Sequence, residues 1–298
     1  MVLFRLIKKF CLFMIKFGII GIAGFVAKKH LSCIKKMKGD LVAAYDKHDN
    51  VGFIDKHYPK AIFFKKEDQF FSFIKKKKLD YLVICSPTYM HSRHIVNGLK
   101  SCANVIVEKP PILDSKNLKT INIYEKKYKK KCHCIFQLRL NKNIIRLKKD
   151  IEKKINNNYK IKISYNTFRG DWYFKSWKNE NKFSGGLSVN IGIHFFDILL
   201  WFFGTALKFK LYKSNQYEVH GKLEFARATA DWKLSTKKLF QEDFKKSFDR
   251  YMMINGKKIN FTKFEDLHHE NYKKIIHEKK FHISEFVNTI KFMEKLKK

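Results

Sequence analysis

Hydrophobic and polar positions follow two different patterns along the chain, and the change between them falls near residue 140. Before it, short runs that are apolar over almost their whole length alternate with longer amphipathic segments. Uniformly apolar runs are typical of parallel strands that are covered on both faces. They predict strands at residues 17–22, 40–46, 61–64, 79–85, 103–108 and 132–137. The segments between them predict helices at residues 28–38, 67–77, 89–100 and 114–130.

Beyond residue 140, apolar and polar residues alternate one by one over several short stretches, as in strands with one buried face. These stretches predict strands at residues 159–168, 207–213, 217–226 and 228–235. Residues 250–261 predict a hairpin, because Asn255-Gly256 at their centre suits a tight two-residue turn. Helices are predicted at residues 141–156, 187–203, 264–277 and 284–296.

The two patterns predict two kinds of sheet. Short strands alternating with helices form a doubly wound parallel sheet, whereas strands joined by short turns form an antiparallel one. We therefore predict an α/β chain with an N-terminal Rossmann-like parallel sheet and a C-terminal α+β domain built on a largely antiparallel open sheet. The predicted divisions are an N-terminal extension at residues 1–16, a first domain at 17–139 and a second at 140–298.

The net charge of +36 invites a nucleic-acid interpretation, which the composition argues against. Lysine supplies 56 of the 63 basic residues and arginine only seven, although arginine is preferred for bidentate contacts to phosphate and guanine. The lysines are spread along the whole chain, and no zinc-finger spacing or RNP-like aromatic pair accompanies them. We expect no specific nucleic-acid partner, but a basic field would attract a substrate that bears phosphates and a carboxylate.

The first 16 residues and the cysteines bear on the compartment. The apolar stretch at residues 10–15 is too short to span a bilayer, and Lys8 and Lys9 interrupt the run before it. We expect no stable membrane insertion; a helix that only touches a membrane is the alternative. The six cysteines form no CxxC pair and no cluster with histidine. This indicates a reducing, cytoplasmic location with no disulfide and no metal.

The first predicted strand ends in a turn of small residues, GIAGFVA at residues 21–27. A bound dinucleotide needs such a turn, because the backbone must approach the pyrophosphate and a helix N-terminus must point its free N–H groups at it. Gly24 and Ala27 match the second and third positions of G-x-G-x-x-G/A, but Gly21 stands one residue too early. An ordinary turn between strand and helix is the alternative. The predicted cofactor contacts here are Gly21, Ala23, Gly24, Phe25, Val26 and Ala27.

Polar residues also end three further strands. Asp46 ends the second, where a carboxylate accepts hydrogen bonds from ribose hydroxyls and repels a 2′-phosphate, so it favours NAD over NADP. A helix cap or turn is its alternative role. Since ligands bind outside the carboxyl ends of strands in such sheets, further cofactor contacts are expected after the fourth and fifth strands. These candidates are Ser86, Pro87, His91, Glu108 and Lys109. For His91, and for His94 one turn on, capping and packing are open roles.

A dense polar and aromatic segment follows the strand predicted at residues 159–168. Its cations are suited to hold a carboxylate and phosphates through charge-assisted hydrogen bonds. An aromatic corner that packs on the sheet is the alternative. The substrate candidates in this segment are Arg169, Tyr173, Ser176, Trp177 and Lys178.

These motifs together resemble the Gfo/Idh/MocA oxidoreductase family. The matching parts are the glycine turn, the S-P-x-x-x-H segment at 86–91, the E-K-P triplet at 108–110 and GGLSVNIGIHFFD at 185–197. The family usually has Asp where this chain has Asn190. Residues 169–178 and 190–197 resemble more closely the UDP-N-acetylglucosaminuronate 3-dehydrogenases of the WlbA/WbpB type, in which Asn is normal there. Residues 137–139 and 266–268 are similar to that subgroup as well.

The resemblance implies an NAD-binding first domain and a second domain that binds substrate and forms a homodimer or homotetramer. It implies oxidation of the C3 hydroxyl of a UDP-linked N-acetylglucosaminuronate (UDP-2-acetamido-2-deoxy-glucuronate) to the 3-keto sugar, in the synthesis of precursors of surface polysaccharide such as lipopolysaccharide. It also implies 2-oxoglutarate as a reoxidant of NADH. Another sugar or inositol dehydrogenase of the family is an alternative, and so is a non-catalytic NAD-binding regulatory protein.

Two residues are the candidates for the chemistry. Oxidation of a secondary alcohol requires removal of the hydroxyl proton as hydride leaves carbon. We assign Lys109 to positioning and electrostatic stabilisation of the oxygen and His194 to acid–base catalysis. Both are also expected to contact the substrate, together with Asn190. A surface lysine and a packed core histidine are the alternative roles.

Overall fold

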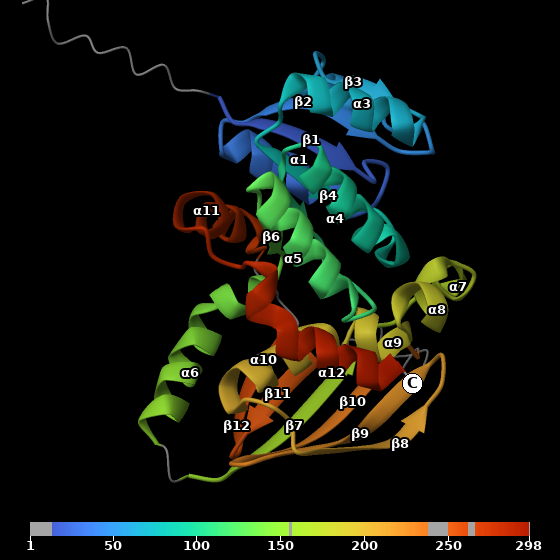
Figure 1. The fold of residues 1–298 in the computed structure, drawn as a ribbon. Coiled ribbons are helices and arrows are strands. Elements are labelled where there is room, and N and C mark those ends of the chain that lie inside the picture. The colour runs from blue at the N-terminus through green and yellow to red at the C-terminus, as the bar shows by residue number, and fades with distance from the viewer. Residues whose placement is uncertain (1–13, 155–156, 238–249, 262–265, 298) are drawn as a thin grey trace, which may run out of the picture.

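The computed structural model describes residues 14–154, 157–237, 250–261 and 266–297 and has two halves, each built on a sheet (Figure 1). Most of the predicted N-terminal extension, residues 1–13, lies outside the described residues. Among the described residues, no single helix has the length and hydrophobicity that crossing a bilayer requires. Adjoining helices at 181–190 and 193–203 reach that length only together, with a bend of 59° between them.

The first half contains the predicted doubly wound sheet. Within the described chain it has six strands, all parallel, in the order β3-β2-β1-β4-β5-β6. The strands are β1 (Lys16–Ile20), β2 (Asp40–Tyr45), β3 (Ile62–Phe64), β4 (Tyr81–Ile84), β5 (Asn104–Val107) and β6 (Cys132–Cys134). The helices between them are α1 (Ala27–Lys36), α2 (Phe53–His57), α3 (Glu67–Lys77), α4 (His91–Lys100) and α5 (Asn117–Tyr128). The sequence prediction of this half is confirmed, apart from the short α2, which it lacked.

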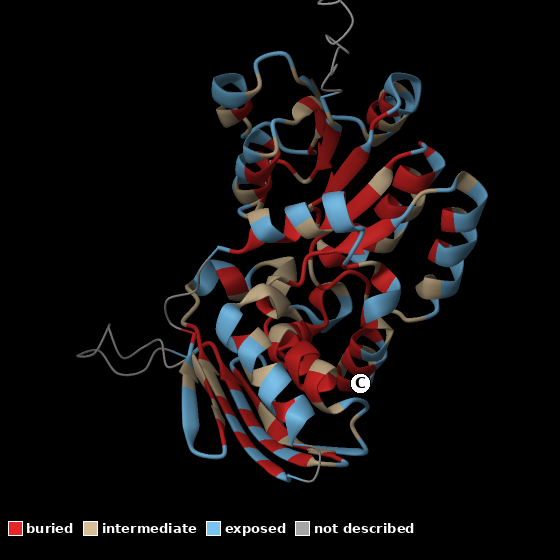
Figure 2. Ribbon diagram, turned by 90° about the vertical axis from the view of Figure 1, so that its left-hand side faces the viewer, coloured by how far each residue is buried: buried red, intermediate tan, exposed pale blue. Residues whose placement is uncertain are grey.

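The apolar runs form the strands because helices cover both faces of this sheet. Ile19, Val83 and Ile106, on three of the four inner strands, are completely buried. Figure 2 shows these strands as a continuous buried layer. The carboxyl ends of β1, β2, β4 and β5 therefore open onto one edge, which faces the second half.

The second half holds a mixed sheet in the order β12-β11-β7-β10-β9-β8. Its strands are β7 (Tyr159–Asn166), β8 (Lys208–Ser214), β9 (Glu218–Phe225), β10 (Ala228–Ser235), β11 (Arg250–Ile254) and β12 (Lys257–Asn260). Neighbours are antiparallel except β7 and β10, so the prediction of a largely antiparallel sheet is confirmed. Buried and exposed residues alternate along β10, whose one face packs on helices while the other lies open (Figure 2). The predicted hairpin turn is present, with φ of 46° at Asn255 and 81° at Gly256.

The predicted single helix at residues 187–203 is wrong. The chain forms two helices there, α9 (Gly186–Asn190) and α10 (Ile193–Phe203). At Gly192 between them, a Cβ atom would lie only 2.2 Å from the carbonyl oxygen of Ser188 and 2.8 Å from the side chain of Leu234. Glycine thus allows the bend to pack closely on β10. The break leaves Asn190 at the end of one helix and His194 in the first turn of the next.

The remaining α-helices of this half lie before, between and after its strands. They are α6 (Lys142–Lys153), α7 (Asp171–Phe174), α8 (Asn181–Ser184), α11 (His268–Glu278) and α12 (Val287–Lys297). Although α11 follows the second sheet in sequence, it packs on α1 of the first half. The chain then returns, and α12 packs against α9 and α10 (Figure 1).

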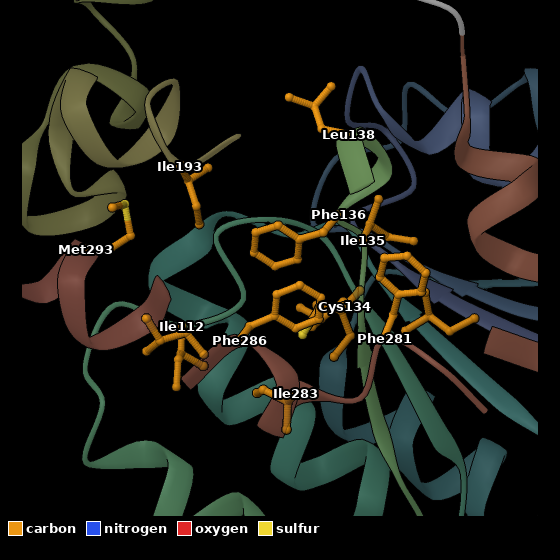
Figure 3. Close-up of a cluster of buried hydrophobic side chains, with 14 of the residues drawn as sticks. Ile112, Cys134, Ile135, Phe136, Leu138, Ile193, Phe281, Ile283, Phe286 and Met293 are labelled. Atoms are coloured by element: carbon orange, nitrogen blue, oxygen red, sulfur yellow. The ribbon is translucent and has the colours of Figure 1, made fainter. Parts of the chain in front are cut away.

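An apolar cluster marks this return. The rings of Phe136, which follows β6, and Phe286, which precedes α12, stack with centroids 4.0 Å apart. Figure 3 shows Ile112 of the first half and Ile193 and Met293 of the second beside them. Residues far apart in the sequence thus share one core between the two halves.

Candidate active site

A cavity of about 970 Å³ lies where the strand ends of the first sheet meet the helices of the second half. This volume is typical of a site for a cofactor and a small substrate. Most of the predicted site residues line it. They are Gly21, Ala23, Gly24, Phe25, Val26, Asp46, Ser86, Pro87, His91, Glu108, Lys109, Arg169, Tyr173, Trp177, Lys178, Asn190 and His194.

Two predicted residues lie elsewhere. Ala27 is completely buried at the start of α1, under the turn rather than on its surface. Ser176 caps a short helical turn, because its hydroxyl donates to the carbonyl of Tyr173 at 2.8 Å and accepts from the N–H of Lys178. Ser176 therefore shapes the segment that carries Lys178 and does not line the cavity.

The turn at residues 21–27 has glycine at two positions where a side chain would crowd the neighbouring backbone. Gly21 has φ of +81°, and a Cβ there would lie 2.5 Å from backbone atoms of Cys85 and Ser86. A Cβ on Gly24 would lie 3.0 Å from the carbonyl oxygen of Gly21. The turn can therefore pass close under a pyrophosphate and lead into the N-terminus of α1, whose dipole favours an anion. Its residues fit a bound dinucleotide.

Asp46 joins this turn to the end of β2. Its carboxylate accepts the backbone N–H of Ala23 and the backbone N–H of His48, each at 3.0 Å. Asp46, Lys47 and His48 all line the cavity next to the glycine turn. The sequence reasoning named neither Lys47 nor His48 as a site residue.

The two histidines after β4 fasten loops. The ring nitrogens of His91 lie 2.8 Å from the carbonyl oxygen of Pro110 and 2.7 Å from that of Ser86. The ring of His94 bonds the Ser86 hydroxyl at 2.8 Å, and burial lowers the pKa of His94 to about 3. His91 thus ties together the two loops that follow β4 and β5, which corresponds to the packing role left open above.

Lys109 reaches across the cavity to the second half. Its Nζ donates to the backbone carbonyl of Asn190 at 3.1 Å, at the break between α9 and α10. Burial lowers the pKa of Lys109, while Glu108 opposes this and the cations Arg169 and Lys178 lower it further. Among the charged groups around His194, the Lys109 ammonium has the largest effect and lowers the pKa of that ring.

His194 points into the same space from the first turn of α10. Its Nδ1 is buried and has no hydrogen-bond partner among the described residues. Burial, and then the charge of Lys109, lower the pKa of His194 to about 3. The ring is therefore neutral at pH 7 and able to accept a proton. A neutral base and a cation from opposite halves of the molecule thus line the same cavity.

Further cations surround this pair. The guanidinium of Arg169 lies 6.0 Å from the ring of Tyr173, and its Nε is buried without a partner in the described part of the chain. The ammonium of Lys178 lies 5.0 Å from the ring of Trp172. Asp46 and Glu108 are the acidic residues that line the cavity among those the structure describes. The cavity thus favours an anionic ligand.

Sequence reasoning missed several lining residues. Lys29, Trp172 and His268 line the cavity without having been predicted as site residues. Lys29 lies in the first turn of α1 and belongs to no motif of the sequence analysis. His268 reaches the site only because α11 returns to the first half, although the segment at 266–268 had matched the subgroup pattern.

Comparison with known proteins agrees with this geometry. A family model described as the oxidoreductase family, NAD-binding Rossmann fold, matches residues 15–136. A model described as the oxidoreductase family, C-terminal alpha/beta domain, matches residues 148–296. The oxidoreductase YteT of Bacillus subtilis is 28% identical over 171 residues, which make up 56% of this chain and 38% of YteT. That match therefore covers little more than a third of the relative.

Solved structures are similar over nearly the whole chain. The WlbA (WbpB) dehydrogenase from Thermus thermophilus, in complex with NAD and UDP-GlcNAcA, is 32% identical with a TM-score of 0.91, covering 96% of this chain and 95% of that one. A second complex, with NAD and alpha-ketoglutarate, has the same identity and TM-score and covers 95% of both chains. The myo-inositol 2-dehydrogenase of Lactobacillus plantarum, 15% identical with a TM-score of 0.76 over 95% of this chain and 96% of its own, shares the fold. This chain belongs to the Gfo/Idh/MocA family of NAD-dependent oxidoreductases.

Proposed function

We propose that this chain uses NAD to oxidise the C3 hydroxyl of a UDP-linked N-acetylglucosaminuronate to the 3-keto sugar. The observation that carries the proposal is that the Lys109 ammonium and the neutral His194 ring line one cavity and interact electrostatically, where Arg169 and Lys178 add further positive charge. Further support comes from the relative of 32% identity, which was crystallised with NAD and UDP-GlcNAcA.

The cofactor would lie along the first half of the cavity. The backbone at Gly21 and Gly24 would lie against the pyrophosphate, because the turn carries no side chains at these positions and leads into the N-terminus of α1. Asp46 would accept hydrogen bonds from the ribose hydroxyls and oppose a 2′-phosphate. Bound NAD would supply the hydride acceptor for the reaction. Residues 17–139 are thus the proposed NAD-binding domain and residues 140–298 the domain for substrate.

Two side chains would take part in the chemical step, one by accepting a proton and the other by stabilising negative charge. As the hydrogen on C3 leaves with its electron pair, the hydroxyl proton must be taken up, and His194 is neutral and placed to accept it. Lys109 would stabilise the negative charge that develops on the oxygen. The balanced products are the 3-keto sugar, NADH and one proton.

The anionic groups of the substrate match the remaining cations. Arg169 has a buried donor with no partner among the described residues, so a uronate carboxylate or a diphosphate oxygen would satisfy it. Lys178 lies between Trp172 and Trp177, with its ammonium 5.0 Å and 5.9 Å from their rings. Asn190 also lines the cavity and would help to hold the sugar. Its backbone carbonyl accepts a hydrogen bond from the Lys109 ammonium.

The reduced cofactor has a proposed route back to NAD. The similar enzyme crystallised with NAD and alpha-ketoglutarate suggests that 2-oxoglutarate takes the hydride and a proton and leaves as 2-hydroxyglutarate. The same cations would bind its two carboxylates. We also propose a homodimer or homotetramer, and a cytoplasmic role in making surface polysaccharide precursors; light scattering of the purified protein would test the assembly.

The direct test is an assay with NAD, 2-oxoglutarate and the UDP-sugar acid, with both products identified by mass spectrometry and NMR. A panel of other sugars and inositols would show whether a different substrate is preferred. Folded protein that produces neither keto sugar nor 2-hydroxyglutarate would contradict the proposal. Lys109→Ala should lower turnover by about two to four orders of magnitude with NAD still bound. Lys126→Ala, on the exposed face of α5, is the matched control and should be neutral.

A further inference from the structure

The carboxylate of Glu108, directly after β5, is hydrogen-bonded on both oxygens behind the catalytic pair. Its Oε2 accepts the backbone N–H of Lys109 at 3.1 Å. Its Oε1 lies 2.9 Å from Nε2 of His30 and 3.2 Å from Nε2 of His268. Burial raises the pKa of Glu108, but the bonds from His268 and His30 outweigh it and hold the pKa well below its ordinary range. Glu108 is therefore an ionised, buried anchor for the backbone of Lys109.

The hydrogen-bond partners indicate which nitrogens of the His30 and His268 rings carry a proton. Since an ionised carboxylate only accepts, Nε2 of His30 must donate to Glu108. Nδ1 of His30 lies 2.8 Å from the hydroxyl of Tyr272, which can then donate to it, so this ring is neutral. The pKa of His30 is lowered, mainly by burial of the ring, in agreement with a neutral state.

His268 differs because it has a carboxylate at each nitrogen. Its Nδ1 lies 2.6 Å from Oδ1 of Asp266, and its Nε2 faces Glu108. Both nitrogens must donate, so the ring carries two protons and a positive charge. Burial lowers the pKa of His268, but the two carboxylates together raise it above its ordinary value of 6.5.

His268 links distant parts of the chain. It starts α11, which packs on α1, and it bonds a residue 160 positions earlier in the sequence (Figure 1). It also lines the cavity, whereas His30 is completely buried in α1. The charged and titratable groups around the His268 ring come from α1, from the end of β5, from α10 and from its own segment. They are Lys29, His30, Glu108, Lys109, His194 and Asp266.

We infer that His268 acts as an imidazolium that positions Lys109: it holds Glu108 so that the second carboxylate oxygen fixes the Lys109 backbone and directs the ammonium across the cavity to Asn190 and His194. The inference rests on the proposed function for the role of Lys109 in turnover, but the charge state of His268 stands apart from it. Deprotonation would remove one of the two donated bonds and leave two carboxylates to share the other. Activity should therefore decline as pH rises through the titration of His268.

Nitrogen-15 NMR of histidine-labelled protein, with and without NAD, tests the charge state without any substrate. The His268 ring should show two protonated nitrogens at pH 6.5 and lose one of these protons as pH rises through its titration, while His194 and His30 stay neutral. In His268→Gln the pKa of His194 should rise, because a nearby positive charge that lowers it is gone. A neutral His268 ring, or an unchanged His194 titration in the folded variant, would overturn the inference.

Steady-state kinetics test the positioning role. His268→Gln keeps one donor to Glu108 but loses the charge, and it should lower kcat about ten- to a hundredfold with the KM for NAD unchanged. It should also lose the alkaline decline that the parent shows. His282→Gln is the matched control. It removes a histidine whose Nε2 lies 2.8 Å from a carboxylate oxygen of Glu125, and neither residue lines the cavity. The kcat of this variant should match that of the parent.

The outcomes separate the two proposals. If His268→Gln keeps both the kcat and the pH profile of the parent, the inference is wrong even though the sugar is a substrate. If the UDP-sugar is not turned over but the NMR results hold, the proposed function fails and the inference is judged by kinetics on whichever substrate the panel identifies. A stoichiometric metal ion found in the purified protein would also overturn it, because the ring nitrogens would then be ligands without those protons.

Discussion

Replacing Asp197 with alanine should destabilise the whole molecule, because this carboxylate is the partner of a buried cation. Asp197 lies in α10, one turn after His194, and its side chain is 1% exposed. Arg139 approaches it with two nitrogens, at 2.8 Å and 2.7 Å, and the hydroxyl of Thr289 donates to it at 2.8 Å. The three residues come from the end of the first half, from α10 and from α12. The substitution therefore removes the hydrogen bonds that link these three segments.

The magnitude follows from the charge left behind. Arg139 is only 11% exposed, and removing one partner of a buried ion pair costs about 3–5 kcal/mol. In a chain of this size each kcal/mol lowers Tm by about 2–4 °C, so we expect a fall on the order of 10 °C. Differential scanning calorimetry and urea unfolding would measure it. Turnover should fall as well in the folded fraction, because α10 carries His194.

A matched exposed pair provides the control. Asp49 lies 2.9 Å from Lys65, and their side chains are 76% and 58% exposed. Asp49→Ala should cost less than about 1 kcal/mol, because water screens such pairs. The double variant Arg139→Met with Asp197→Leu should recover most of the loss, since no charge is then left unpaired. If Asp197→Ala destabilises no more than Asp49→Ala, the reasoning is refuted.

Three further predictions concern the cofactor and pH. Gly21→Ala should weaken NAD binding in calorimetry, because a left-handed φ costs an alanine about 1–2 kcal/mol and its Cβ meets backbone at 2.5 Å; Gly52→Ala, with nothing within 4 Å, should bind normally. Asp46→Ser should lower the preference for NAD over NADP by about tenfold in kcat/KM, and an unchanged ratio would exclude Asp46 from ribose recognition. Because the pKa of His268 is raised in the folded state, its contribution to stability is present below pH 6.5 and lost as pH rises through the folded pKa. The unfolding free energies of the parent and His268→Gln should therefore converge on the alkaline side, and a gap that stays constant would contradict this.

Local patterns were sufficient to predict most elements and the edge of the sheet that carries the site. Asn255-Gly256 adopts the left-handed pair of angles that its hairpin requires. Gly21, Asp46 and Lys109 could be placed because each ends a uniformly apolar strand, and parallel strands end at one edge. In these cases the physical cause lies within a few residues of the position predicted.

The parts that escaped prediction depend on contacts between distant segments. The close packing at Gly192 involves Leu234, on a strand that comes later in the chain, whereas the local sequence is a continuous apolar run. The charge on His268 depends on Glu108, which the return of α11 brings to it. Ser176 was placed in the site by its neighbours' chemistry, but its hydroxyl is used in a cap. Periodicity and spacing contain no information on such partners.

The stacked rings of Phe136 and Phe286 bear on how reactants enter and leave. Swinging the two halves apart would expose this shared core to water, at a cost of about 25 cal/mol for each Å² of apolar surface. Cofactor and substrate should therefore pass through the mouth of the cavity, near the 86% exposed Phe25, while the contact between the two halves stays intact. A bound nucleotide would therefore exchange through that opening without any separation of the two halves.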